Sequence, residues 1–351
     1  MSSKGPIRTA LHRARAWGAA SLPARLFHTK LPSRSFRSMG TLATVTLGTD
    51  YAERIESVTE RIHAIFDRLE SAMSAYRPRS AISELSRMAG VAPIAIPEDT
   101  YRVLDFGRHF GNLTSGAFDT TASPLVSLWG FNGAPVPTAA PSDQSIREVL
   151  KRVDYRRLVL GDGTAFLPSR GMAVDVGGIG KGYAIDRAFD YCLGSGIRDF
   201  LIDFSGNMRA AGRPSRRSSW QIGVRDPFDG SRILAKFALP SGLAVATSGS
   251  YERFVEIAGQ RFSHIVDPRT GYPVTGTASV TVLCGNAVTA DALSTALFVI
   301  GIEGAVELLK KVPSVELLLV PDRYPARFSL TPGLDKALVS QKSIPRSLLA
   351  W

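Results

Sequence analysis

Cysteine is almost absent from this sequence, which has only Cys192 and Cys284 in 351 residues. Two cysteines cannot form a disulfide framework, and neither belongs to a C-x-x-C pair. Each lies in an apolar segment, so we interpret both as small buried side chains. The cysteine content therefore leaves the cellular compartment open.

Long hydrophobic runs are also lacking. The most apolar stretch, Ala292–Ile302, is too short to cross a bilayer, which takes about 20 residues. A hydrophobic content of 44% with 21% charged residues is ordinary for a folded soluble protein. The sequence thus predicts a soluble body without a transmembrane segment.

Acidic residues are missing from the first 37 positions, although eight lysines and arginines occur there. Much of the net charge of +11 lies in this leader. The remainder is mildly basic and has neither zinc-finger spacing nor interleaved aromatic and basic residues. We therefore expect no nucleic-acid partner.

The leader, residues 1–36, is predicted to be a disordered or targeting segment. Its one apolar stretch is broken by Pro23 and Arg25, and no cysteine follows, so neither a secretory nor a lipoprotein signal is evident. A cytoplasmic or an organellar location stays open. We expect one domain over residues 37–340 and a short tail over 341–351.

Between leader and tail, the spacing of apolar residues changes from segment to segment. Residues 39–47 alternate as a strand does, and a spacing of three or four predicts a long helix over 55–73. Further helices are predicted at 99–114, 181–193, 290–300 and 303–311, and further strands at 158–160, 172–176, 200–204, 220–224, 243–247 and 279–283. Because strands outnumber crossover helices, the predicted class is α+β, with mixed, mainly antiparallel sheets flanked by helices.

A glycine-rich segment, Val174–Tyr183, follows one predicted strand and begins a helix. Glycines allow close approach to a phosphate, a helix start presents free N–H groups, and Lys181 adds positive charge. The segment matches neither the Walker pattern nor G-x-G-x-x-G. It is either a phosphate-binding loop or a tight turn that needs small residues.

A carboxylate and a hydroxyl lie four residues apart in the helix predicted at 290–300. Asp291 and Thr295 therefore share one side of that helix, a relation that suits a hard cation such as Mg²⁺. The alternative is that Asp291 caps the helix.

Two further segments carry polar groups at turns. His264 precedes Asp267-Pro268, and a lone histidine there is either structural or functional. The segment Gly116–Thr121 joins glycine to an aromatic residue and a carboxylate, and alone it has little specificity.

Together these segments resemble the ApbE-like family of FAD-dependent protein flavin transferases. The matching pieces occur in the family's order over nearly all of residues 39–301. They are Ser38–Thr41, Ser74–Pro78, Gly116–Asp119, Leu128–Phe131, Asp175–Asp186, Trp220–Pro227, Ala246–Gly249, His264–Gly271 and Ala290–Thr295. Two departures, Thr120 in place of a proline and Ser205-Gly206-Asn207 in place of a Gly-Gly pair, affect only local loop geometry.

The resemblance implies an FAD cleft between two subregions and a magnesium site formed by Asp291, Thr295 and the backbone carbonyl of Gly178. It implies catalytic roles for His264, Lys181 and Asp175. The residues that it implies for FAD binding are Met39, Tyr76, Ala117, Phe118, Asp119, Asp175, Lys181, Ile265 and Val288.

By the same resemblance, the reaction is magnesium-dependent transfer of FMN from FAD to a threonine or serine of an acceptor protein, with release of AMP. The implied acceptor is a flavoprotein subunit of an electron-transfer complex, and the implied location is extracytoplasmic or membrane-associated. Two alternatives stay open from the sequence. They are a magnesium-dependent FAD pyrophosphatase, in which water is the nucleophile, and a flavin-binding protein without turnover.

Overall fold

The computed structural model describes residues 31–349 except 217, 324–327 and 342–345. Its centre is a sheet of nine strands in the order β1-β2-β6-β7-β10-β13-β14-β15-β17, antiparallel throughout except for the last pair. These strands are β1 (Ser33–Ser38), β2 (Thr41–Leu47), β6 (Phe200–Phe204), β7 (Asn207–Ala211), β10 (Ala244–Gly249), β13 (Thr277–Cys284), β14 (Glu316–Pro321), β15 (Phe328–Leu330) and β17 (Arg346–Leu348). The predicted α+β class is confirmed.

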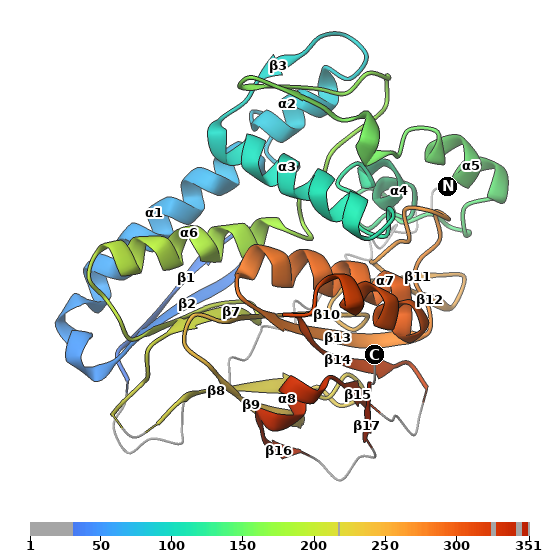
Figure 1. The fold of residues 1–351 in the computed structure, drawn as a ribbon. Helices are drawn as coiled ribbons and strands as arrows, with labels where there is room; N and C mark the ends of the chain where they lie inside the picture. The colour runs from blue at the N-terminus through green and yellow to red at the C-terminus, as the bar shows by residue number, and fades with distance from the viewer. Residues whose placement is uncertain (1–30, 217, 324–327, 342–345, 350–351) are drawn as a thin grey trace, which may run out of the picture.

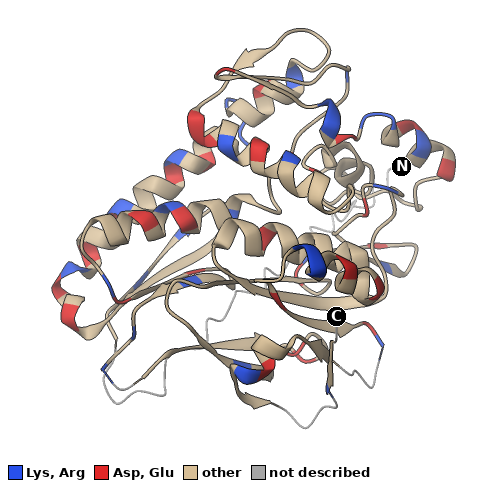
Figure 2. Ribbon diagram, viewed as in Figure 1, with Lys and Arg blue, Asp and Glu red and all other residues tan. Residues whose placement is uncertain are grey.

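Three long helices, α1 (Ile55–Met73), α6 (Gly180–Gly194) and α7 (Ala287–Lys311), lie on one face of this sheet (Figure 1). The predicted apolar stripe of α1 is buried, with Ile62, Phe66 and Leu69 fully enclosed. Charged residues gather on the outer sides of α1 and α6, whereas the central strands are mostly uncharged (Figure 2). The main core therefore lies between the helices and the sheet.

The two helices predicted at 290–300 and 303–311 form one element, α7, with a kink at Gly301, where φ is 69°. Among the described helices, α7 alone is long and apolar enough to span a membrane, with a mean hydropathy of 1.8. In this fold 56% of that apolar window is buried, and α7 packs on β10, β13 and α6. This burial is typical of a core helix in a soluble fold.

The opposite face of the large sheet is partly covered by a three-stranded sheet in the order β16-β9-β8. Its strands are β8 (Trp220–Arg225), β9 (Ile233–Leu239) and β16 (Leu338–Gln341). Trp220, Ile222 and Phe237 of this sheet are buried in a second core, together with Leu318 of the large sheet.

Smaller elements complete the described fold. They are α2 (Ala81–Arg87), α3 (Glu98–Leu113), α4 (Ser123–Leu128), α5 (Asp143–Leu150), α8 (Pro332–Lys336), the short helices Thr49–Arg54 and Tyr155–Arg157, the sheet β3-β5-β4 (Ile94–Ala95, Thr164–Phe166, Val159–Gly161) and the hairpin β11-β12 (Phe254–Ile257, Gln260–Ser263).

Three segments differ from the sequence expectations. Residues 172–176 form a loop rather than a strand, because their backbone groups bond to other loops, as Asp175 N–H does to the Thr120 carbonyl. Strand β1 begins inside the predicted leader, and β17 lies inside the predicted tail. Both strands are short and largely exposed, so their residues carry no apolar pattern to reveal them.

Candidate active site

A single large cleft of about 3000 Å³ contains most of the residues singled out from the sequence. Its lining includes Met39, Tyr76, Ala117, Phe118, Asp119, Asp175, Gly178, Lys181, His264, Ile265, Asp291 and Thr295. Val288 does not line it. The Val288 side chain is buried in the main core, and its N–H donates to Asp186 Oδ2 at 2.9 Å.

Asp291 lies in the second turn of α7 and is only 3% exposed. The alternative that it caps the helix is wrong, because Asn286 is the cap and its Oδ1 accepts from Thr289 N–H at 2.9 Å. Asp291 Oδ1 accepts from Asn207 Nδ2 at 2.8 Å, and Oδ2 accepts from Gly182 N–H at 2.9 Å.

The glycines before and inside α6 allow neighbouring segments to pack closely against the start of this helix. None of those at positions 177, 178, 180 and 182 has a positive φ, so a left-handed turn does not explain them. A Cβ on Gly182 would lie 2.2 Å from the Ala287 carbonyl oxygen and 2.8 Å from Asp291 Cβ. Glycine at 182 therefore lets α6 approach α7 closely enough for its N–H to reach the Asp291 carboxylate.

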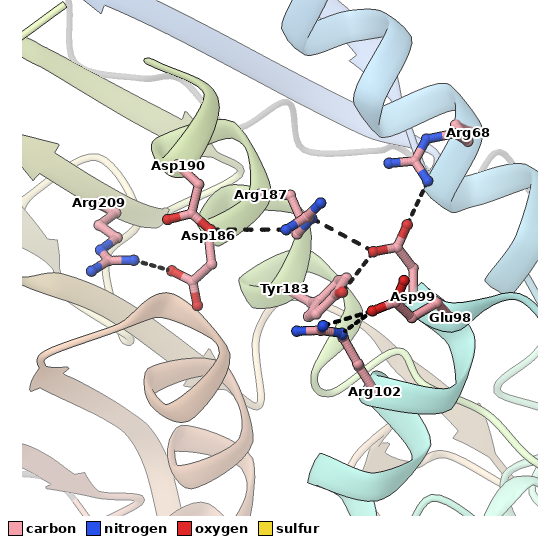
Figure 3. A network of polar contacts seen from close by, with 9 residues as sticks. All are labelled: Arg68, Glu98, Asp99, Arg102, Tyr183, Asp186, Arg187, Asp190 and Arg209. Atoms are coloured by element: carbon pink, nitrogen blue, oxygen red, sulfur yellow. Dashed lines mark hydrogen bonds and ion pairs between the residues drawn. The ribbon is translucent and has the colours of Figure 1, made fainter. Parts of the chain in front are cut away.

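α6 is held in place on its other side by a polar network (Figure 3). Tyr183 donates its hydroxyl to Asp99 Oδ1 of α3 at 2.7 Å, and Arg187 lies 3.5 Å from the same oxygen. Arg68 of α1 pairs with the second oxygen of Asp99. These contacts join three helices and fix the position of the start of α6 against α7.

Thr295 follows Asp291 by one helical turn and borders the glycine loop. Its Oγ1 lies 3.3 Å from the Asp291 backbone oxygen and 3.4 Å from Ser248 Oγ. A Cβ on Gly178 would lie 3.2 Å from that same hydroxyl. The fold therefore brings Gly178, Asp291 and Thr295 together from two separate segments.

These residues fit a magnesium ion by their chemistry. Within the described residues, no three His, Cys, Asp or Glu side chains cluster in a way that could hold a metal. A metal here would thus be held by one carboxylate with hydroxyl, carbonyl and water oxygens, the donors that Mg²⁺ prefers. Each Asp291 oxygen accepts one hydrogen bond from a neutral donor and keeps a further lone pair.

Two sources of positive charge lie next to Asp291. Lys181 Nζ lies 3.8 Å from Asp291 Oδ1, a loose contact that leaves the ammonium group available to an anion. The N-terminus of α6 adds the partial positive charge of a helix start. The arrangement can therefore bind a phosphate group beside the carboxylate.

His264 is neutral in this site. Its Nδ1 lies 3.0 Å from the Arg253 carbonyl oxygen. Since a carbonyl only accepts, Nδ1 carries the proton and Nε2 keeps its lone pair. Burial, and next the charge of Arg253, lower the pKa of His264 to about 4. The ring can accept a proton through Nε2 and does not carry a permanent charge.

Asp175 and Asp119, the two other cleft carboxylates that the sequence singled out, have different environments. Asp175 Oδ1 accepts from Gly177 N–H at 2.7 Å, and burial raises the pKa of Asp175. Asp119 accepts from the backbone and hydroxyl of Thr121 and from Tyr155 N–H, so it holds its own loop together. Asp175 is therefore better placed than Asp119 to exchange a proton.

Asn207 is the site residue that the sequence did not identify. It is 3% exposed and begins β7, and its amide orients the Asp291 carboxylate. It lies in the departure Ser205-Gly206-Asn207, and its partner is 84 residues away. A contact of that kind has no local sequence signal.

Comparisons with known proteins identify relatives of this chain. The model of the ApbE family matches residues 39–319. The curated FAD:protein FMN transferase of Treponema pallidum is 32% identical over 314 residues, which are 83% of this chain and 85% of that protein. The one of Vibrio cholerae is 30% identical over 80% of this chain and 86% of its own length.

Solved structures share the fold. The crystal structure of the ApbE protein of Thermotoga maritima has a TM-score of 0.79 at 30% identity and covers 88% of this chain and 99% of its own. The flavinyl transferase ApbE of Pseudomonas stutzeri, in its apo form, has a TM-score of 0.78 at 26% identity, covering 90% and 99%.

Proposed function

This chain belongs to the ApbE family, and we propose that it is an enzyme that transfers FMN from FAD to a hydroxyl group of an acceptor protein. One observation carries the proposal. The start of α6 places Gly182 N–H and Lys181 at the buried Asp291, beside Thr295 and Gly178, in one cleft. The names of the relatives, FAD:protein FMN transferases, support the same reaction.

The reaction is a displacement at the pyrophosphate of FAD. The acceptor hydroxyl attacks the phosphorus on the flavin side, the bond from that phosphorus to the bridging oxygen breaks, and AMP leaves with the electron pair. The proton of the hydroxyl passes to Nε2 of His264 or to Asp175. Lys181 and the start of α6 offset the negative charge of the phosphates.

A magnesium ion held by Asp291, Thr295 and the carbonyl of Gly178 would stabilise the charge that develops on the leaving phosphate. Asn207 and Gly182 hold the Asp291 carboxylate in the orientation that this requires. We propose that the flavin lies against Met39, Tyr76 and the loop 117–119 and that Ile265 completes the pocket, since all of these line the cleft.

The size of the cleft favours transfer over simple hydrolysis. Sites for one small molecule usually measure roughly 300–1000 Å³, and this cleft measures about 3000 Å³. The additional space suits a second, macromolecular substrate. We propose that this substrate is a flavoprotein subunit of an electron-transfer complex.

The test is to incubate the purified protein with FAD and MgCl₂, with and without a candidate acceptor, and to separate the products by chromatography and gel electrophoresis. We expect AMP release and flavin fluorescence on the acceptor band, and loss of both in Asp291→Ala. FMN and AMP without a labelled acceptor would indicate a hydrolase instead. FAD that binds and is never cleaved would leave only a binding protein.

His264→Ala tests the proton acceptor. We expect FMN transfer to slow by roughly 100-fold, the usual contribution of a general base, with FAD affinity unchanged. An unchanged rate would assign the role to Asp175.

A further inference from the structure

One strand of the small sheet has an unpaired edge inside the active-site cleft. β8 pairs with β9 alone, so its other edge is open in the described structure. Residues 219–226 line the cleft in unbroken succession. Side chains of a strand point alternately to its two faces, so a continuous run of lining residues means that the strand presents its backbone edge. The side chains of Trp220, Ile222 and Val224 are buried in the second core.

The pairing identifies the backbone groups on this open edge. Ala238 of β9 sits opposite Gln221, yet its N–H donates to the carbonyl of Ala337, toward β16. Gln221 and Ala238 are therefore a pair without mutual hydrogen bonds. Because such pairs alternate along antiparallel strands, the N–H and C=O of Gln221 and Gly223 point away from β9. No described residue bonds to these four groups.

The open edge leads to the phosphate site. Glu252 experiences the charge of Arg225, at the C-terminal end of β8, and also the charges of Lys181 and Asp291. β8 thus ends within electrostatic range of the groups that bind the phosphates. Both lie in the same cleft, whose volume exceeds the need of one small molecule.

We propose that an extended segment of the acceptor protein adds to β8 as a further strand, hydrogen-bonded to the backbone of Gln221 and Gly223, and that this pairing carries its threonine or serine to the FMN phosphorus. The inference rests on the proposed function and specifies how the second substrate is recognised. An open strand edge offers alternating N–H and C=O groups, which complement an extended peptide main chain over several residues. In recognition of this kind the main-chain hydrogen bonds supply affinity and alternate side chains supply specificity.

The first test uses synthetic 12-residue peptides, each with one central threonine and randomised flanks, incubated with the full chain, FAD and MgCl₂. We expect some peptides to become flavin-labelled. In the best of them, N-methylation of single backbone amides should lower labelling by roughly three- to tenfold per lost hydrogen bond, at every second position only. Equal effects at successive positions would overturn strand addition, whereas FAD cleavage with no labelled peptide would indicate a hydrolase and so overturn the proposed function.

The second test blocks the edge from the enzyme side. Gly223→Pro removes an outward N–H and leaves the bonds to β9 in place. We expect labelling of the selected peptide to fall at least tenfold while FAD affinity stays within twofold. Val339→Pro, on the opposite edge strand β16 and outside the cleft lining, is the matched control and should label normally.

Hydrogen exchange distinguishes other occupants of the edge. In the free enzyme we expect the amides of Gln221 and Gly223 to exchange faster than those of Trp220 and Ile222, and to become protected by the peptide. Protection already present in the free enzyme, from residues 1–30 or from a second copy of the chain, would contradict the proposal. A wild-type protein that neither binds nor cleaves FAD would overturn the proposed function itself, which separates the two failures.

Discussion

Two carboxylates of α6 and α7, Asp186 and Asp291, lie near the same helix contact and have opposite surroundings. Asp186 accepts from Arg209 Nη1 at 2.8 Å and from the first two amides of α7, and both side chains of the ion pair are 14% exposed (Figure 3). Asp291 is buried as deeply, but its cation, Lys181, stands 3.8 Å away. The charge of Asp186 is balanced by Arg209, whereas Asp291 can still accept a bond from a ligand.

The difference separates a structural group from a reactive one. A buried charge is costly unless it is paired, and Arg209 pairs Asp186 while stacking on the Phe189 ring at 3.8 Å. Asp291 has only two neutral donors in close contact. We infer that the fold tolerates this cost because magnesium and phosphate complete the site.

The largest expected effect comes from Asp291→Ala. We predict that FMN transfer falls about 1000-fold, the scale of losing a group that stabilises a transition state. The free energy of unfolding should change by about 1 kcal/mol or less, because losing two hydrogen bonds is offset by removing a buried charge. Transfer assays and urea unfolding measure the two effects. A variant that unfolds easily and still transfers FMN would show that Asp291 serves the stability of the fold, as Asp186 does, and not the reaction.

Asp186→Ala should show the reverse pattern. It leaves Arg209 buried without its partner and removes the acceptor of the Ala287 and Val288 amides, so we predict a loss of about 3 kcal/mol in unfolding free energy. Transfer below the melting temperature should stay within tenfold of the wild type. Arg209→Met, which removes the other partner, should destabilise to a similar degree.

Gly182→Ala tests whether the helix contact links the two regions. Its Cβ would meet the Ala287 carbonyl at 2.2 Å, so α6 and α7 must separate, at a cost of about 2 kcal/mol. The amide that orients Asp291 moves with α6, and we expect transfer to fall tenfold or more. Gly194→Ala, at the other end of α6 with no atom within 4 Å, is the control. Normal activity in Gly182→Ala would show that Asp291 does not depend on this contact.

The sequence predicted the helices better than it predicted the strands or the site. Apolar periodicity identified α1 and both halves of α7, because these helices bury one continuous stripe. It missed β1, whose exposed serines and arginines are held by pairing with β2 alone. It also predicted a strand at 172–176, where the backbone bonds to neighbouring loops and not to another strand.

The contacts within the site could not be predicted from the sequence, because they join residues that are far apart along the chain. Gly182 and Asp291 are 109 residues apart, and they meet only because α6 and α7 pack on the same sheet face. The resemblance to a family named Asp291 and the segment 175–186, which contains Gly182, without saying that the two touch. Asn207 had no signal at all, since its function depends on the position of β7 beneath α7.

The smallest expected effect concerns the protonation of His264. Arg209 is paired with Asp186. Burial, and next the charges of Arg253 and Lys181, lower the pKa of His264 to about 4. The unfolded chain binds a proton at this histidine near pH 6.5, so the folded state loses stability as pH falls from about 6.5 toward 4. We predict that the melting temperature of the wild type falls relative to that of His264→Gln across this window and runs parallel to it above pH 7. Thermal unfolding at successive pH values measures this difference. A constant difference from pH 7 to 4.5 would mean that neither burial nor the cleft cations lower the pKa of His264.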